Sequence, residues 1–426
     1  MSGDFSAFKA MAVGIAALLT LTMVAPEVTG GQFDLLKIAK KKGLTIDGGL
    51  NTGSTSTSTS THGDGTTGTV TAAPTTTTTP TGTTTNSFYT EASLVPSNFD
   101  INSELVPAWG TGAIPASGKP DVVGAFRFIC NAGQLRSDDP IVYPGQPGKS
   151  HLHQFYGNTS ANANSTYSSL RQSGQSTCMS PLNRSAYWMP AMLDGKGNVV
   201  RPDFVAIYYK RRPASDPKCS LTSGDSKAEG NCVPLPNGLR FIFGYNMLNG
   251  SAPPTGELYF DCKGPGAVPG HYADFATAAS KCPAGAQLGA IVKAPGCWDG
   301  KNLDTPDHRS HVAYHTYGTW GYAKCPSTHP YVIPGFTLQA WYTVGTGESV
   351  TNWRFSSDEM HPELPHGKTF HADWFGAWDN TVMGMWMDNC INKLLNCSAG
   401  NLGNGKQLKQ FAGFSWTASP RLVAIP

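Results

Sequence analysis

Charged side chains are scarce in this chain. Asp, Glu, Lys and Arg make up 14% of its 426 residues, and the formal net charge at pH 7 is +2. Its basic runs are short, such as Lys40–Lys42 and Lys210–Arg212. A surface that binds nucleic acid needs a dense basic patch or stripe. We therefore expect no nucleic-acid partner.

The sequence motifs of several common enzyme classes are absent. The chain has no Gly-x-Ser-x-Gly elbow, no Gly-x-x-x-x-Gly-Lys-Ser/Thr loop, no dinucleotide-binding glycine fingerprint after a strand and no His-Glu-x-x-His. These motifs hold, in that order, a nucleophilic serine, nucleotide phosphates, a dinucleotide and a catalytic zinc ion. Their absence argues against serine hydrolases, nucleotide-dependent enzymes and zincin metalloproteases.

Cysteine is absent from the first 129 residues, and no Cys-x-x-Cys pair occurs. The ten cysteines are even in number and widely spaced, which is typical of disulfides rather than of zinc or dithiol redox sites. Cys219 with Cys232, and Cys390 with Cys397, are near enough in sequence to close short loops, and the pairing of the other six stays open. Disulfides indicate an exported protein.

The first 86 residues are unsuited to a packed core. Lys9 precedes the apolar run Met11–Pro26, so we interpret residues 1–31 as a signal peptide or a signal anchor. Residues 32–86 are interpreted as a low-complexity Thr/Ser/Gly/Pro linker of the kind found in O-glycosylated stalks. We expect a secreted or cell-surface protein, for which an uncleaved leader would be a membrane tether.

Residues 87–426 have few helical patterns and many short runs of β-branched and aromatic residues bounded by turn formers. The expected strands are Val122–Cys130, Phe204–Lys210, Leu239–Tyr245, Glu257–Cys262, Leu288–Val292, His311–Tyr317 and Thr337–Val344. The expected helices are Tyr272–Ser280 and Asp388–Leu395. The long, irregular spacing of the strands favours a mainly β fold, a single large disulfide-containing sandwich of jelly-roll type with long loops.

Six of the eleven histidines gather in three stretches. The first contains His151-Leu152-His153. On an extended strand His-x-His points both imidazoles to one face, as a metal site or a catalytic groove requires. Two interpretations stay open: a site for Zn²⁺ or Cu²⁺, with His311 and His371 as the best partners, or two structural histidines beside an aromatic core.

The second stretch, residues 304–315, combines carboxylates with imidazoles. On a strand beginning near Ser310, His311, Ala313 and His315 would share a face, and Asp307 and His308 would lie in the turn before it. A histidine beside a carboxylate can act as a general acid or base. The alternative is an Asx-type turn in which Asp307 caps backbone amides.

The third stretch is His371-Ala372-Asp373-Trp374-Phe375. If it is extended, His371 and Asp373 share a face beside aromatic rings, as in sugar-processing grooves. The alternative is a buried strand with its aromatics in the core. Upstream, Asp139 is a further candidate carboxylate, although Asp before Pro is also a common turn former.

These stretches together resemble the domain of unknown function DUF1996, which occurs in secreted proteins of fungi and bacteria. The segments that carry the resemblance are Asp139–Gly145, Ser150–Asn158, Thr177-Cys178, Tyr187–Pro190, Cys297–Gly300, Leu303–Tyr314, Cys325-Pro326, His329-Pro330 and His371–Phe375. One departure is Ala372, which stands where the family has Gly. The resemblance implies a secreted, disulfide-containing domain, often joined to other modules by low-complexity linkers, and it implies no reaction.

From the residues we predict a secreted enzyme that acts on an extracellular polysaccharide or the cell wall, either a glycoside hydrolase or a uronate lyase. The candidate catalytic residues that would line its groove are His153, Asp307, His308, His311, His371 and Asp373. Hydrolysis would use Asp307 and Asp373 as the acid and the base or nucleophile. Elimination would use a histidine as base, with a cation or Arg309 stabilising the developing charge.

No cofactor is required by this prediction, and a metal ion is an option. Two alternatives stay open: a non-catalytic extracellular module that binds glycans or the wall, and a metal-dependent enzyme. Five asparagines stand in Asn-x-Ser/Thr sequons, which matter only in a eukaryotic secretory pathway: Asn158, Asn164, Asn183, Asn249 and Asn396.

Overall fold

The structure is a computed structural model that describes residues 95–108, 123–319 and 321–426. The predicted leader (residues 1–31) and linker (residues 32–86) lie outside the described residues, and the predicted domain boundaries stay a prediction. In the described residues strands outnumber helices, which confirms the mainly β class. None of the helices described is both long and apolar enough to cross a membrane.

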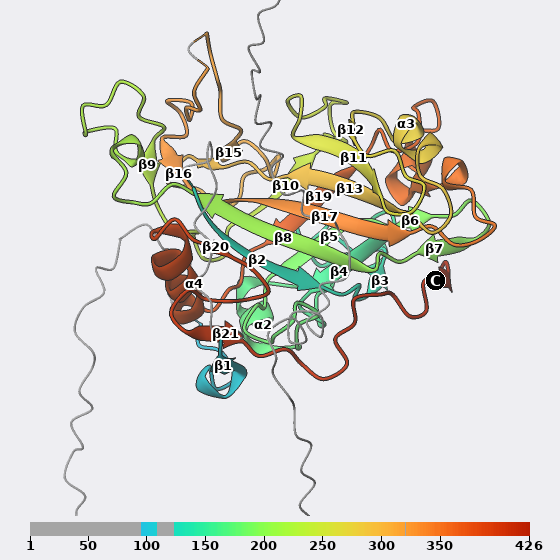
Figure 1. Ribbon diagram of the computed structural model, residues 1–426, viewed down its shortest axis with the longest axis horizontal. Coiled ribbons are helices and arrows are strands. Elements are labelled where there is room, and N and C mark those ends of the chain that lie inside the picture. Colours follow the sequence, from blue (N-terminus) through green and yellow to red (C-terminus); the bar gives the residue numbers. More distant parts are fainter. Residues whose placement is uncertain (1–94, 109–122, 320) are drawn as a thin grey trace, which may run out of the picture. The chain divides into compact units, whose positions relative to one another are not determined.

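The larger sheet has seven strands and is antiparallel except at one edge, where β2 and β20 run parallel. Figure 1 shows β17, β8 and β2 of this sheet side by side. Its strands, in spatial order, are β12 (His271–Tyr272), β11 (Leu258–Lys263), β13 (Gln287–Lys293), β17 (Gly335–Thr343), β8 (Phe204–Arg211), β2 (Gly124–Cys130) and β20 (Asn396–Cys397).

The second sheet has five antiparallel strands and carries the candidate site. Its strands, in spatial order, are β10 (Arg240–Gly244), β19 (His371–Phe375), β5 (Ala186–Pro190), β4 (His153–Gly157) and β3 (Leu135–Arg136). All five residues of β4, of β5 and of β19 are buried. A strand buried on both faces needs cover on both, so this sheet lies between the larger sheet and a layer of loops.

The two sheets pack face to face around one hydrophobic core. Phe336 of β17 lies 5.1 Å, ring centroid to ring centroid, from Trp374 of β19. The hydroxyl oxygens of Tyr187 in β5 and Tyr209 in β8 are 2.8 Å apart. This packing confirms the predicted sandwich.

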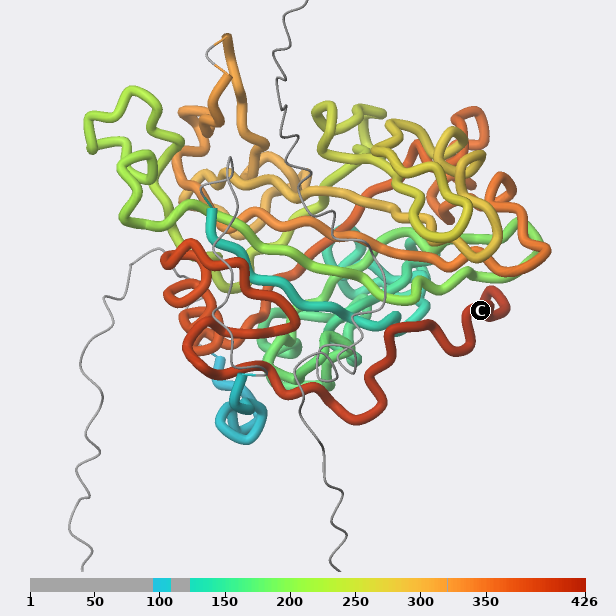
Figure 2. The backbone as a smooth tube through the Cα atoms, in the orientation of Figure 1, coloured from blue at the N-terminus to red at the C-terminus, as the bar shows by residue number. Residues whose placement is uncertain are grey.

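Smaller elements close the ends of the sandwich. One four-stranded sheet contains β15 (Val312–Ala313), β14 (Cys297–Trp298), β16 (Tyr331–Val332) and β9 (Asn231–Cys232). Another contains β18 (Arg354–Phe355), β6 (Met192–Leu193), β7 (Asn198–Val200) and β22 (Leu422–Ala424). β1 (Leu105–Pro107) pairs with β21 (Lys406–Leu408). Figure 2 shows the C-terminal segment running from β21 along the molecule to its pairing with β7.

The described helices are short. The α-helices are α2 (Tyr167–Gln172), α3 (Phe275–Ser280) and α4 (Asn380–Trp386), and a π-helix (Met387–Ile391) continues α4. The 3₁₀ turns are Asn102–Glu104, Pro217–Cys219, Val350–Asn352 and Ser356–Met360. The expected helix Tyr272–Ser280 is shorter than predicted, because Tyr272 belongs to β12 and Asp274 caps α3 with its side chain.

All ten cysteines form disulfides. The five bonds are Cys130–Cys178, Cys219–Cys232, Cys262–Cys282, Cys297–Cys325 and Cys390–Cys397. The two loops that the spacing suggested are therefore confirmed. Five disulfides fit an extracellular protein.

Candidate functional site

The site lies on the outer face of the five-stranded sheet. Side chains alternate between the two faces along a strand, so His153 points to the same face as Phe155, and Asp373 to the same face as Phe375. Both phenylalanines belong to a hydrophobic cluster outside the main core, whereas Trp374 belongs to the main core. His153, His371 and Asp373 therefore face the layer of loops that covers this sheet.

Close approach of two strands fixes the position of His371. Gly244 of β10 pairs with His371 of β19. A Cβ atom on Gly244 would lie 2.8 Å from the Cα of His371, and the φ of Gly244 is +88°. Only glycine permits both the contact and the conformation.

Three imidazoles meet at the start of β4 and β19. One nitrogen each of His151, His153 and His371 lies within 4.8 Å of the other two. The ring centroids of His151 and His153 are 4.2 Å apart, and those of His151 and His371 are 5.2 Å apart. His153 and His371 are buried and His151 is half-buried. The three nitrogens are near enough to one another to hold one metal ion.

Backbone carbonyls orient two of these rings. The Nδ1 of His153 is 3.0 Å from the carbonyl oxygen of Asp138, and the Nδ1 of His371 is 2.8 Å from that of Thr369. A ring that donates from Nδ1 keeps the lone pair of Nε2, as metal-binding histidines do. The Nε2 atoms of His151 and His153 are buried and have no hydrogen-bond partner in the described residues.

Two carboxylates adjoin the imidazoles. One ligand atom each of Asp139, His153 and Asp373 lies within 4.8 Å of the other two. Asp139 accepts hydrogen bonds from the backbone amides of Ile141 and Val142. Both carboxylate oxygens of Asp373 are buried, and neither has a hydrogen-bond partner within the described ranges.

Burial sets the protonation of this cluster. It lowers the pKa of His153 to about 3, with a smaller contribution from the repulsion that two protonated rings, His153 and His371, would have. It lowers the pKa values of His151 and His371 as well, so all three imidazoles are neutral at pH 7 and able to bind a metal. Burial and the neighbouring Asp139 raise the pKa of Asp373 well above its ordinary value.

The 3₁₀ turn Ser356–Met360 supports the cluster from behind. Asp358 accepts hydrogen bonds from the backbone amide and the hydroxyl of Thr369, whose carbonyl oxygen contacts His371. The hydroxyl of Ser356 donates to the carbonyl oxygen of Leu152, between the two histidines of the first stretch. This turn therefore positions both histidine segments.

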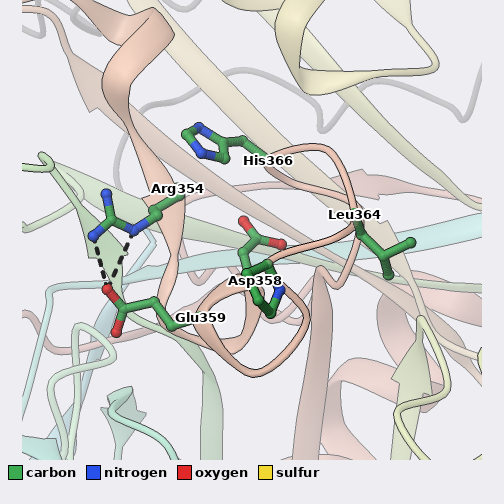
Figure 3. A pocket seen from close by; sticks show the side chains of 6 residues that line it. Arg354, Asp358, Glu359, Leu364 and His366 are labelled. Atoms are coloured by element: carbon green, nitrogen blue, oxygen red, sulfur yellow. Dashed lines mark hydrogen bonds and ion pairs between the residues drawn. The ribbon is translucent and has the colours of Figure 1, made fainter.

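A surface pocket is lined in part by residues of the same turn. In Figure 3, Arg354 contacts Glu359 beside Asp358, with Leu364 and His366 across the pocket. The oxygens of Asp358 are engaged by backbone amides and by Thr369, and His366 is exposed. The pocket contains no member of the histidine cluster. We assign it no role.

The turn before β15 brings positive charge to the site. Arg309 donates to the carbonyl oxygens of Gly244 and Tyr245, which places its guanidinium beside the strand pair that carries His371. Its charge acts on Asp373, where it opposes the rise in pKa. His308 acts on Asp139 in the same direction, although burial dominates there and raises the pKa of Asp139.

His308 forms a dyad with a carboxylate. Its Nδ1 lies 2.8 Å from Oδ1 of Asp304, whose other oxygen accepts from Arg240. The backbone φ of His308 is +56°, an unusual value for a residue other than glycine. Its Nε2 makes no hydrogen bond to any residue that the structure describes, and its side chain is partly exposed. The dyad has the form of a general base whose ring a carboxylate orients.

Two of the predicted catalytic residues lie in structural roles. Oδ1 of Asp307 accepts hydrogen bonds from the amides of Arg309 and Ser310 and from the hydroxyls of Ser310 and Thr305, so the Asx-type turn is the observed alternative. Both ring nitrogens of His311 are engaged, by Thr305 and by the carbonyl oxygen of Arg240. The expected strand His311–Tyr317 is reduced to Val312–Ala313.

The predicted residues thus divide into three groups. His153, His371 and Asp373 come together in the cluster, His308 lies beside it, and Asp307 and His311 hold the neighbouring turn. His151 and Asp139, both flagged in the sequence but absent from the catalytic set, join the cluster. Asp304 and Asp358 act behind the histidines, and no sequence signal distinguished their roles.

A second group of potential ligands is ruled out by covalent chemistry. Cys297, Cys325 and His315 place ligand atoms within 4.8 Å of one another. The two sulfurs form a disulfide, so neither is a thiolate. His315 lies 2.8 Å from Oε1 of Glu229. This group is structural.

Comparison with known proteins gives one match. The model of a protein family described as a domain of unknown function, DUF1996, matches residues 139–378. The matched segment runs from Asp139 past Asp373 and so contains the whole cluster. No curated protein matches the chain, and no solved structure matches it either.

Proposed function

Because the chain belongs to the DUF1996 family, whose description records no function, we propose a function from the site: an extracellular metal-dependent enzyme that cleaves uronate-containing polysaccharides by elimination. His151, His153 and His371 hold a divalent transition metal ion, with Asp373 and Asp139 beside it. The five disulfides support the extracellular location.

The observation that carries the metal site is the set of buried atoms without partners. These are Nε2 of His151, Nε2 of His153 and both carboxylate oxygens of Asp373, taken over the described residues. Leaving a buried polar atom unpaired costs about 1–3 kcal/mol. A divalent cation satisfies several such atoms at once, and its charge would offset the cost of ionising the two buried carboxylates.

The donor set indicates the kind of metal. Neutral imidazoles with adjacent carboxylates suit Zn²⁺, Fe²⁺, Mn²⁺ or Cu²⁺ better than Ca²⁺ or Mg²⁺, which prefer oxygen ligands. When bound, such an ion supplies a Lewis acid for an acidic group of the substrate. Of the three histidines, His151 is the most exposed to solvent.

The groups around the cluster favour elimination over hydrolysis. Hydrolysis was predicted to use Asp307 with Asp373, but Asp307 is committed to its turn. Elimination requires a base and a positive charge near the uronate carboxylate. His308, oriented by Asp304, supports the first role, and Arg309 supports the second.

In this reaction Nε2 of His308 takes the proton from the ring carbon that carries the carboxylate. The electron pair of that C–H bond forms a double bond to the neighbouring ring carbon. The glycosidic C–O bond at that neighbour breaks, and its oxygen leaves with a proton from solvent. Arg309 would stabilise the negative charge that develops on the carboxylate, and a bound metal ion would supply a Lewis acid for the same group.

Metal analysis tests the site. The full chain is secreted in oxidised form, loaded in turn with Zn²⁺, Mn²⁺, Fe²⁺ and Cu²⁺, desalted and analysed for metal content. We expect one ion per chain in the wild type and in the exposed-histidine control His366→Ala, and none in His151→Ala/His153→Ala. Equal metal content in the wild type and the double variant would exclude this site.

A polysaccharide panel tests the reaction. Polyuronates and neutral glycans are incubated with the metal-loaded protein, and both unsaturated-uronate absorbance and reducing ends are measured. We expect absorbance from polyuronates only, with a loss of about 10²–10⁴-fold in His308→Ala. Reducing ends without absorbance would indicate hydrolysis, and a metal-loaded protein inactive on every glycan would refute the reaction while leaving the metal site in place.

A further inference from the structure

The five Asn-x-Ser/Thr sequons differ in the burial of their asparagines. All five lie in described parts of the chain. Asn158 and Asn183 have 0% exposure, Asn396 is half-buried, and Asn164 and Asn249 are exposed. An N-linked glycan occupies the Nδ2 atom and needs open space around it, so these differences decide which sequons can carry one.

The side-chain amide of Asn158 is fully used. Its Nδ2 donates to the carbonyl oxygens of Leu170 and Ser173, at 2.8 and 3.0 Å, and its Oδ1 accepts from the amide of Ser160. A sugar on Nδ2 would replace one of its two hydrogens. It would remove one of these two buried hydrogen bonds and would enter a space that other atoms fill.

The side-chain amide of Asn183 is also buried and hydrogen-bonded. Its Nδ2 donates to the hydroxyl of Tyr187, which bonds in turn to Tyr209 in the core between the sheets. Its Oδ1 accepts from the amide of Ser185. A glycan at this position would separate the two sheets.

Asn396 lies in β20, where it pairs with Ala125 of β2. Its Oδ1 accepts from Arg127 at 2.8 Å. The next residue, Cys397, forms a disulfide with Cys390, seven positions earlier in the sequence. The half-buried asparagine is therefore held through its side-chain oxygen, beside a disulfide-bonded neighbour.

Asn164 and Asn249 present their amides to solvent. The backbone amide of Asn164 bonds to Asn162, and no hydrogen bond of its own Nδ2 is found in the described residues. Asn249 lies at the tip of the loop after β10. Backbone hydrogen bonding between Asn246 and Ser251 closes this loop. Its Oδ1 accepts from Ser251, the residue is exposed, and no hydrogen bond of its Nδ2 is found in the described residues.

We propose that Asn164 and Asn249 are the N-glycosylation sites of this protein in a eukaryotic secretory pathway, and that Asn158, Asn183 and Asn396 stay unmodified in the secreted molecule. The donor is a lipid-linked oligosaccharide. A bond forms between Nδ2 and the anomeric carbon of the first sugar, the bond from that carbon to the lipid pyrophosphate breaks, and the amide proton leaves with the pyrophosphate.

Glycan transfer precedes completion of folding, so burial acts as a filter on the secreted population. A chain modified at Asn158 or Asn183 would lack buried hydrogen bonds and would not reach the native state. Secreted molecules are therefore those in which these two asparagines are free. This inference does not depend on the metal site or on the reaction.

The test is site-resolved mass spectrometry of the full chain secreted from a eukaryotic host. Glycosidase release in heavy-oxygen water marks each occupied asparagine by conversion to labelled aspartate. We expect the label at Asn164 and Asn249 and unlabelled peptides at the other three. On gels, Asn164→Gln and Asn249→Gln should each remove one glycan step, and the double variant should migrate as the deglycosylated wild type.

Asn158→Gln and Asn183→Gln separate glycan loss from misfolding. Both are expected to keep the wild-type glycan number in whatever protein is secreted, with secretion reduced because the buried hydrogen bonds are lost. Label at Asn158, Asn183 or Asn396 in the secreted protein would overturn the assignment. Absence of label at Asn164 or Asn249 would overturn it equally.

Discussion

At the scale of single residues, Asp358 lies two hydrogen bonds behind the imidazole of His371. It holds Thr369, and the carbonyl oxygen of Thr369 holds Nδ1 of His371. Groups that orient a metal ligand typically change metal affinity by about 10–100-fold when mutated. We therefore expect Asp358→Asn to weaken metal binding by that factor. The new side-chain NH₂ group would face N–H and O–H donors, from which the carboxylate oxygen it replaces accepts hydrogen bonds.

The measurement is a competition titration against a chromophoric chelator, with circular dichroism as the check on folding. Asp307→Asn is the matched control, since Asp307 also accepts several hydrogen bonds in a turn but does not support His371. It should keep wild-type metal affinity. Equal affinities in both variants would mean that Asp358 does not act through His371.

Glu229 provides a prediction on pH. Burial opposes its ionisation, but His315 and Arg212 outweigh burial and lower the pKa of Glu229 below its ordinary value of 4.5. A carboxylate with a lowered pKa in the folded state stabilises the protein above its unfolded pKa, and this contribution is lost as the pH falls. Glu229→Gln should therefore destabilise the protein by about 1–3 kcal/mol at pH 7.

Urea unfolding of the wild type and Glu229→Gln over a series of pH values measures this difference. It should be present where Glu229 is ionised and should shrink as the pH falls below the ordinary glutamate pKa of 4.5. The exposed carboxylate Glu363 offers the control Glu363→Gln. A difference between wild type and Glu229→Gln that grows toward acid pH would contradict the sign of the shift.

Sequence patterns located the histidines of the site better than the roles of their neighbours. His-x-His spacing predicted that His151 and His153 act together, and His371 was named as a partner before the structure placed it beside them. His311 was named for the same role, yet Thr305 and a backbone carbonyl engage it. Which nitrogen is free depends on partners distant in sequence, and no local pattern records them.

At the scale of secondary structure, hydrogen bonds between the sheets hold the sandwich together beneath the site. Tyr209 of β8 bonds to Tyr187 of β5 and accepts from the indole of Trp378. Tyr209→Phe would remove this hydroxyl, so the buried hydroxyl of Tyr187 and the buried indole N–H of Trp378 would each lose a hydrogen bond. We expect a loss of about 1–3 kcal/mol in the free energy of unfolding.

Tyr208→Phe is the matched control on the adjacent position of β8, where the side chain lies on the opposite, half-exposed face. Its ring keeps the contact with the guanidinium of Arg127. Chemical denaturation should separate the two variants clearly. Equal stability of Tyr208→Phe and Tyr209→Phe would mean that the hydrogen bond between the sheets contributes nothing measurable.

The long strands were predictable and the short ones were not. β8 and β13 each lie within one residue of the expected bounds, because runs of β-branched and aromatic residues end at turn formers. The run from His311 was also expected to be a strand, but only Val312–Ala313 is one. His311 lies in the turn that the hydrogen bond from the amide of Val312 to the carbonyl oxygen of Arg309 closes. Local hydrogen bonding overrode the propensity of that segment.

At the scale of the whole molecule, the site depends on contacts between distant parts of the chain. Asp139 comes from a loop ahead of β4, His153 begins β4, and Asp373 lies in β19. β19 reaches β4 only through β5, which lies between them in the sheet. Strand order of this kind is not written in local patterns, so the sequence alone predicted a shared site without its geometry.

Metal binding should therefore stabilise the whole molecule and not one loop, because its ligands join separate segments of the five-stranded sheet. A ligand that binds only the folded state at a hundred times its dissociation constant adds about 2.7 kcal/mol. For a domain of this size that corresponds to a rise of roughly 5 °C in Tm. Differential scanning calorimetry of the metal-free and metal-loaded full chain should show this rise in the wild type and in His366→Ala. It should show no rise in His151→Ala/His153→Ala, and an equal rise in that variant would place the stabilising ion elsewhere in the chain.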